Sequence, residues 1–179
     1  MPDERPAEAA RRSRQSRAHG RELALLALCH LESYRPDERP KALEIFWTHA
    51  PAEAGDAGTD LRAWLADADA VGFARDLLAP ILARGPELDA ILEATSRSWR
   101  VARMDRVDRN VLRLVAAELS PRPRPSAGEP APAAADLSET PRGVVLAEAV
   151  RLASRYGSER SAAFVNGVAE ALARKLRPG

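Results

Sequence analysis

Cysteine is almost absent from this chain of 179 residues, which holds one, Cys29. A single thiol excludes an intramolecular disulfide and fits a reducing compartment. Aromatic residues are scarce at 4%, and no alternating runs rich in Val, Ile or Thr appear. Such runs are what strands are usually made from, whereas helix formers dominate here. These absences predict an all-α protein.

Long apolar runs and a strong net charge are missing as well. The apolar stretch Leu23–Cys29 ends at His30 and Glu32, and no small-residue cleavage site follows it. We therefore expect neither an export signal nor a membrane span, and we expect a cytoplasmic protein. The formal net charge of +1 excludes a surface that is basic throughout, so any binding of nucleic acid requires a local patch.

No catalytic or metal-binding pattern is present. The three histidines have no metal-ligand spacing to Cys29 or to one another, and no glycine-rich phosphate loop occurs. Cys29 lies in an apolar stretch, which favours a buried thiol over a nucleophile. The acids Asp67 and Asp69 stand two residues apart and would point to different sides of a helix. We expect no enzyme activity, no cofactor and no metal.

Apolar spacing divides the chain into helices and irregular segments. Residues 1–10 offer nothing to bury, and we predict a disordered basic arm at 1–14 followed by one helical domain at 15–179. A loop is expected at 50–60, and five prolines between Pro121 and Pro132 mark an insertion at 121–139. The first predicted helices cover about residues 16–33, 40–47 and 61–78, the last with a break at Gly72. Another helix is predicted to begin at Pro86, one to cover 105–119, and two to follow residue 140.

That final pair has well-marked ends. Pro141 suits a first helical turn, and Gly157 is expected to stop the helix in a left-handed turn. Ser158 or Ser161 is available to cap the next helix. Its predicted apolar face comprises Phe164, Gly167, Val168, Ala171 and Leu172.

An ordered set of motifs resembles the NusB family of bacterial transcription antitermination factors. The motifs are Arg21-Glu22-Leu23-Ala24, Ser98–Met104, Val107–Leu114 with Glu118-Leu119, and the C-terminal pair ending in Phe164-Val165-Asn166-Gly167-Val168. The resemblance covers about residues 11–34 and 73–176. It implies a NusB-like fold of about seven helices, as two small helical bundles packed into one domain. It also implies binding of boxA-type single-stranded RNA together with the ribosomal protein NusE, so that RNA polymerase in an antitermination complex reads through ribosomal RNA operons.

The N-terminal arginines are the candidate RNA contacts. Five occur within eleven residues that contain no acid: Arg11, Arg12, Arg14, Arg17 and Arg21. On a helix, Arg14, Arg17 and Arg21 share one face, where guanidinium groups can follow the phosphates of a strand. The alternative from composition is a solvated arm in an arginine-rich protein. The resemblance favours RNA and adds Phe164 as a ring at the RNA-binding end, although ordinary core packing also explains that spacing.

The resemblance places Asp108 near the partner surface, and Arg113, within an apolar context, is a candidate interface residue. Three departures from the family pattern, Cys29, Ala147 and Arg160, bear on RNA preference. Two rivals follow: the RNA-recognition domain of a ribosomal RNA methyltransferase, or a helical scaffold that has lost RNA binding. Self-association into a homodimer is left open.

Overall fold

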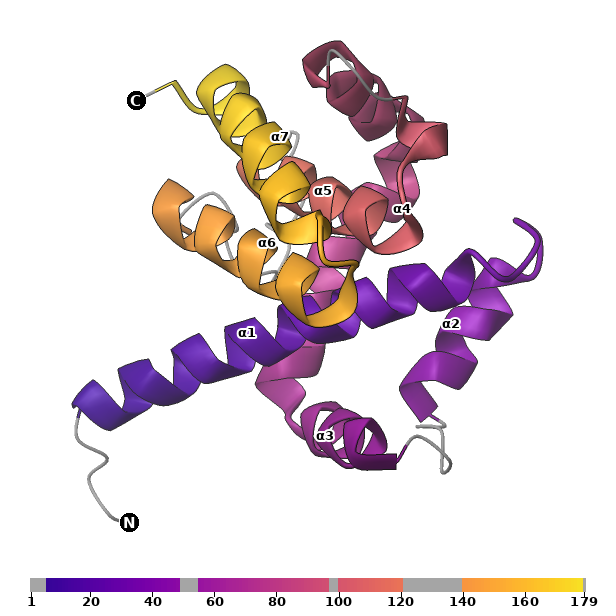
Figure 1. Cartoon of the computed structure of the whole chain (residues 1–179). Coiled ribbons are helices and arrows are strands. Elements are labelled where there is room, and N and C mark those ends of the chain that lie inside the picture. The colour runs from indigo at the N-terminus through magenta and orange to yellow at the C-terminus, as the bar shows by residue number, and fades with distance from the viewer. Residues whose placement is uncertain (1–5, 49–54, 97–99, 121–139, 179) are drawn as a thin grey trace, which may run out of the picture. The chain divides into compact units, whose positions relative to one another are not determined.

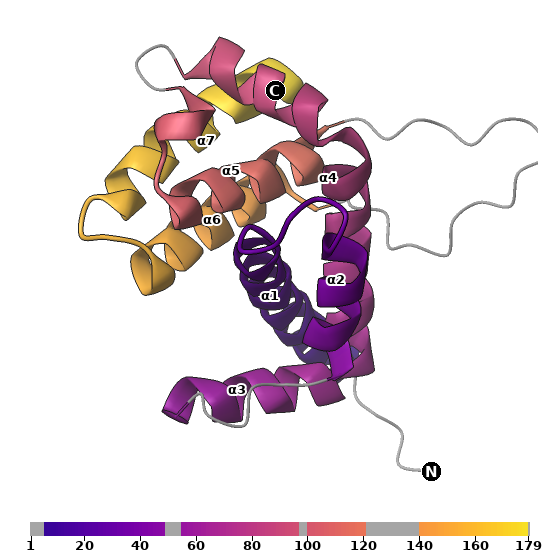
Figure 2. The same cartoon turned by 90° about the vertical axis from the view of Figure 1, so that its right-hand side faces the viewer.

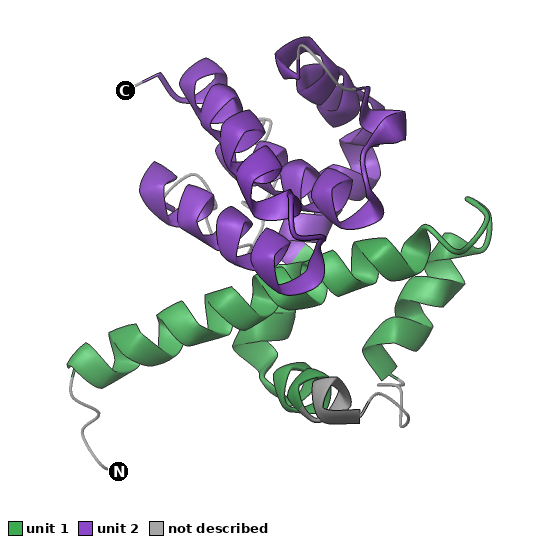
Figure 3. Ribbon diagram, viewed as in Figure 1, with its two compact units in different colours: residues 1–75 green, residues 76–179 purple. Residues whose placement is uncertain are grey.

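The computed structural model describes residues 6–48, 55–96, 100–120 and 140–178, and the side chains of 55–59 lie outside that description. Within these ranges the chain forms seven α-helices, one 3₁₀ helix and no strand, which confirms the all-α prediction (Figure 1). It divides into two compact units, residues 1–75 and 76–179 (Figure 3).

Unit 1 is built around one long helix. Helix α1 (Pro6–Leu31) contacts α2 (Arg39–Thr48) and α3 (Gly55–Ala66), and the unit also includes the first residues of α4 (Ala68–Thr95). Helix α1 buries Leu23, Leu25 and Leu28, and α2 and α3 bury Phe46 and Trp64, so each helix presents an apolar face. Burying these faces supplies most of the stability, at about 25 cal/mol for each Å² of apolar surface removed from water.

Unit 2 continues α4 and adds the 3₁₀ helix η1 (Val101–Arg103), α5 (Arg106–Leu119), α6 (Arg142–Tyr156) and α7 (Ser161–Leu176). The last three helices contact one another, and Figures 1 and 2 both draw them side by side. Their core contains Leu112, Leu152 and Leu172, which are fully buried. Arg177 donates from its guanidinium to the carbonyls of Glu118, Leu119 and Thr140, and so ties the end of α5 to the start of α6. The insertion predicted at 121–139 lies outside the described residues.

Two predicted boundaries in unit 1 are wrong. Helix α1 begins at Pro6, so residues 6–14 are helical rather than irregular; proline suits a first turn, and Glu8 in that turn complements the helix dipole. Helix α3 begins at Gly55, inside the predicted loop. Leu61 and Trp64 on α3 are buried, and this packing outweighs the low helix propensity of its glycines.

The helix break predicted at Gly72 is also wrong, because the helices α3 and α4 are separated at Asp67. The Asp67 carboxylate accepts hydrogen bonds from the backbone N–H groups of Asp69 (3.1 Å) and Ala70 (3.3 Å). Asp67 therefore caps α4, a role for which aspartate is preferred. The restart predicted at Pro86 corresponds to a kink within α4, where Arg84 has φ −124° and ψ 23°. Proline removes a helical hydrogen bond and disfavours helical geometry just before it.

Gly157 ends α6 as predicted, but not by the predicted conformation. Its φ is −92° and its ψ −170°, an extended geometry that any residue adopts. Glycine is needed there for space, since a Cβ atom would lie 2.7 Å from the carbonyl oxygen of Ala153 and would meet the Ser161 hydroxyl. Ser161 Oγ accepts a hydrogen bond from the backbone N–H of Ser158 at 2.9 Å. This bond closes the turn between α6 and α7.

Candidate functional site

The five N-terminal arginines all lie on α1, at increasing depth along the helix. Arg11, Arg12 and Arg14 are exposed, Arg17 is half-buried, and Arg21 is only 4% exposed. Because α1 extends beyond the buried part of unit 1, its first turns present their guanidinium groups to solvent. The outer arginines are thus placed to meet a polyanion, whereas Arg21 is not on the surface.

Arg17 and Arg21 both lie over the ring of Phe73. The distances from the guanidinium carbon to the ring centroid are 5.5 Å and 5.0 Å. A guanidinium over an aromatic face is attracted by the ring quadrupole, more strongly where water is excluded. Arg21 also donates to the carbonyl of Arg17 at 3.3 Å. These contacts give Arg21 a role inside unit 1 that the spacing of charges did not indicate.

The middle of α1 is fixed against the start of α4. The Ser16 hydroxyl donates to the Asp67 carboxylate at 2.7 Å, and the His19 ring stacks on Trp64 of α3 at 5.3 Å. Burial raises the pKa of Asp67, whereas hydrogen bonds from Ser16 and from backbone N–H groups lower it. The hydrogen bonds together have the larger effect, so the net pKa lies below its usual value. These contacts hold the exposed arginines at a defined position relative to the rest of unit 1.

Asp108, predicted as a partner contact, is 6% exposed in unit 2. Burial raises the pKa of its carboxyl group, a hydrogen bond from Ser161 lowers it, and the nearby charge of Asp105 raises it, so the net shift is upward. Its Oδ1 atom is buried without a hydrogen-bond partner. The carboxyl group lines a hollow of about 350 Å³, together with Arg103, Met104, Asp105, Ser158, Arg160 and Phe164.

Arg113, the other predicted interface residue, forms a forked ion pair. Its Nε and one terminal nitrogen each donate to a different oxygen of Asp89, both at 2.7 Å, and the other nitrogen donates to Asn110 at 3.1 Å. The side chains of Arg113 and Asp89 are 20% and 31% exposed. This pair holds α5 to α4 within unit 2. The partner-contact assignments of Asp108 and Arg113 stay predictions.

Phe164 lies at the first turn of α7 and is half-buried. It lines the hollow beside Asp108 and also a larger one of about 810 Å³. Of the apolar face predicted for α7, only Leu172 is buried, and Phe164, Gly167, Val168 and Ala171 line the larger hollow instead. The core side is the neighbouring stripe of Val165, Ala169, Leu172 and Ala173, of which only Leu172 was predicted.

The positions that depart from the family pattern differ in their surroundings. Cys29 is half-buried in α1, and Ala147 is exposed on α6. Arg160 precedes α7, is exposed, and lines the hollow beside Asp108. The α1 arginines belong to unit 1 and Phe164 to unit 2, so their joining in one site stays a prediction.

The described residues hold neither a metal-binding cluster nor a membrane-spanning helix. That part of the chain contains no group of three or more His, Cys, Asp or Glu side chains able to hold a metal ion. None of its helices combines the length and apolar character that crossing a bilayer requires.

Comparison with known proteins gives a consistent result. The sequence model described as "NusB family" matches residues 19–127 and 134–174. A protein of Sorangium cellulosum named "Transcription antitermination protein NusB" is 41% identical over 161 residues, which are 90% of this chain and 94% of that protein. A protein of the same name from Myxococcus xanthus is 38% identical over 158 residues, covering 88% and 94%.

The fold has a counterpart among solved structures. A structure titled as T. maritima NusB superposes with a TM-score of 0.64 at 25% identity, covering 90% of this chain and 93% of that one.

Proposed function

Because the chain belongs to the NusB family, we propose that it is a transcription antitermination factor that binds boxA-type single-stranded RNA together with NusE and promotes read-through of ribosomal RNA operons by RNA polymerase. Its chemistry would be that of a binding platform. One face holds an RNA strand, another holds the partner protein, and each ligand strengthens the binding of the other by the same factor.

The observation that carries this proposal is the exposure of Arg11, Arg12 and Arg14 on one projecting part of α1. No acidic residue occurs from Arg11 to Arg21, so the only formally charged side chains of this segment are basic. Guanidinium groups bind phosphates through two parallel hydrogen bonds and are well suited to a nucleic-acid backbone. Phe164 adds a ring on which a base could stack.

The relatives bear on the rival functions. The relatives named above are antitermination proteins, and this chain covers 94% of each. That match supports antitermination over the recognition domain of a methyltransferase. The scaffold rival is separated by a binding measurement, because it predicts no specific contribution of the α1 arginines.

The test is a titration of the full chain, with NusE present, against a boxA-bearing RNA over a range of salt concentrations. Replacing Arg11, Arg12 and Arg14 together by alanine should lower the slope of log K against log salt by about 2, at about 0.7 per phosphate for a single strand. The matched control replaces the exposed Arg35, Arg39 and Arg62, which changes the net charge equally. If both triple variants gave the same salt slope, the α1 arginines would make no specific contact with RNA. Only the rival function, a helical scaffold that has lost RNA binding, would then remain.

A further inference from the structure

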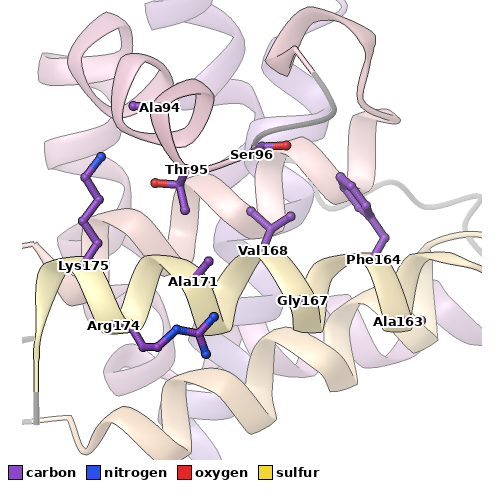
Figure 4. Close-up of a pocket in the computed structure, with 10 residues that line it drawn as sticks. All are labelled: Ala94, Thr95, Ser96, Ala163, Phe164, Gly167, Val168, Ala171, Arg174 and Lys175. Carbon is purple, nitrogen blue, oxygen red and sulfur yellow. The ribbon is translucent and has the colours of Figure 1, made fainter.

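The larger hollow of unit 2 is a groove between the C-terminal end of α4 and one face of α7 (Figure 4). Its volume is about 810 Å³. Phe164 and Val168 point from α7 toward the α4 side, where Thr95 and Ser96 lie. The groove therefore has one apolar wall with a ring near its start, and one wall with hydroxyl groups.

Small residues keep this groove open. A Cβ atom added at Gly167 would meet nothing within 4 Å. Ala163 and Ala171, which flank Gly167 on the same face, also line the groove. Small side chains therefore leave a shallow depression on this face of α7 between Phe164 and the end of the helix, and a ligand can reach it.

The far end of the groove is basic. Arg174 and Lys175 are exposed and line it, and none of its ten lining residues is acidic. Lys175 points toward α4, and Arg174, which also lines the groove, is exposed and has its guanidinium 3.8 Å from the Glu170 carboxylate. At about 1.5 Å per residue, these cations lie about 16 Å beyond Phe164 along the helix.

We propose that the single-stranded RNA of the proposed function runs from Phe164 along this groove to Arg174 and Lys175. A base stacks on the Phe164 ring, the strand crosses the low surface at Gly167, and phosphates meet the two cations. Stacking surfaces combined with a basic track are the usual means of holding an unpaired strand. The absence of acid among the lining residues favours this polyanion over an apolar protein segment. This inference rests on the proposed function and extends it.

The first test removes the basic end. Replacing Arg174 and Lys175 by alanine should lower the salt slope of RNA binding by about 1.4, since two phosphate contacts are lost. A double variant of Arg35 and Arg39 carries the same charge change outside the groove and should leave the slope unaltered. If the Arg174 and Lys175 variant keeps the parent slope while the α1 triple variant lowers it, the groove proposal is overturned and the proposed function stands.

The second test fills the groove. Gly167→Leu places a side chain in open space, so the helix should fold normally, and RNA affinity should fall about tenfold through lost stacking and blocked passage. Gly143→Leu is the matched control, since a Cβ atom at Gly143 in α6 also meets nothing within 4 Å. Unchanged RNA affinity of the folded Gly167 variant overturns the proposal. Loss of NusE binding with RNA binding intact does the same, because it assigns the groove to a protein partner.

Discussion

The arginines of α1 show how one residue type serves two purposes along one helix. Arg14 is exposed, whereas Arg21, two turns later on the same face, is buried over Phe73. The sequence spacing correctly indicated a shared face but could not indicate that the face turns inward. Depth depends on where α4 crosses α1, which no local pattern encodes.

We therefore expect Arg21 and Arg14 to respond differently to truncation. Arg21→Ala should lower the free energy of unfolding by about 2 kcal/mol, because a desolvated cation–π contact and the packing of its stem are lost. Arg14→Ala should stay within about 0.5 kcal/mol of the parent, as surface substitutions usually do. Urea denaturation measures both. Equal costs would contradict the buried role of Arg21.

Asp67 gives a second prediction at the residue scale. Asp67→Ala should cost about 1 kcal/mol, the usual effect of losing a helix cap. Asp67→Asn keeps an accepting oxygen but cannot titrate, so it separates capping from charge. Unfolding measured for each variant near neutral pH checks the cost of the cap.

The sign of the pH effect follows from the depressed pKa of Asp67. A carboxyl group whose pKa is lower in the folded state stabilises the fold above its unfolded value of 3.8, and this contribution is lost as pH falls through the folded value. Between about pH 6 and about pH 3, the parent should lose more stability than Asp67→Asn. Parallel curves for the two chains would show that the ionised carboxylate contributes nothing.

At the scale of elements, α7 is decided by which of two adjacent stripes is buried. Its sequence carries small and apolar residues on more than half of its circumference, so periodicity alone supports either stripe as the core side. Packing against α5 and α6 selects Val165, Ala169, Leu172 and Ala173. The other stripe, beginning at Phe164, is left to line the groove. Helical steps of three and four residues from Phe164 reach Arg174 and Lys175, so the sequence itself carries the signal that places these cations on the same stripe.

Two helical glycines should respond oppositely to the same substitution. At Gly20, a Cβ atom would lie 2.7 Å from the carbonyl oxygen of Ala70 and 2.9 Å from the Phe73 ring, because α1 and α4 cross closely there. Gly20→Ala should therefore destabilise by about 1–3 kcal/mol through overpacking.

At Gly167 the space is open, and Gly167→Ala should stabilise by up to about 1 kcal/mol through better helix propensity. Thermal or urea unfolding of the two single variants provides the comparison. If Gly20→Ala proved more stable than the parent, α1 and α4 would be able to move apart at Gly20 without loss of packing energy, which would contradict this prediction.

At the scale of the whole molecule, we predict that one RNA strand uses both units. If it does, Arg14→Ala in unit 1 and Phe164→Ala in unit 2 should each weaken RNA binding, Phe164→Ala by about 1–3 kcal/mol for a lost stacked base. The double variant should lose about the sum of the two when the sites are well separated. Binding titrations at fixed salt measure all three variants. RNA affinity insensitive to Phe164 would restrict the strand to unit 1.

The sequence by itself determined the helical class, most helix positions in the C-terminal half and the basic character of the N-terminal segment. Those features follow from composition, apolar period and end signals, which act over a few residues. Only the tertiary structure decided which arginines are exposed and which stripe of α7 faces a groove. It also decided that the helix break between α3 and α4 falls at Asp67 and not at Gly72. Each of these depends on contacts between helices distant in sequence, where packing outweighs local preference.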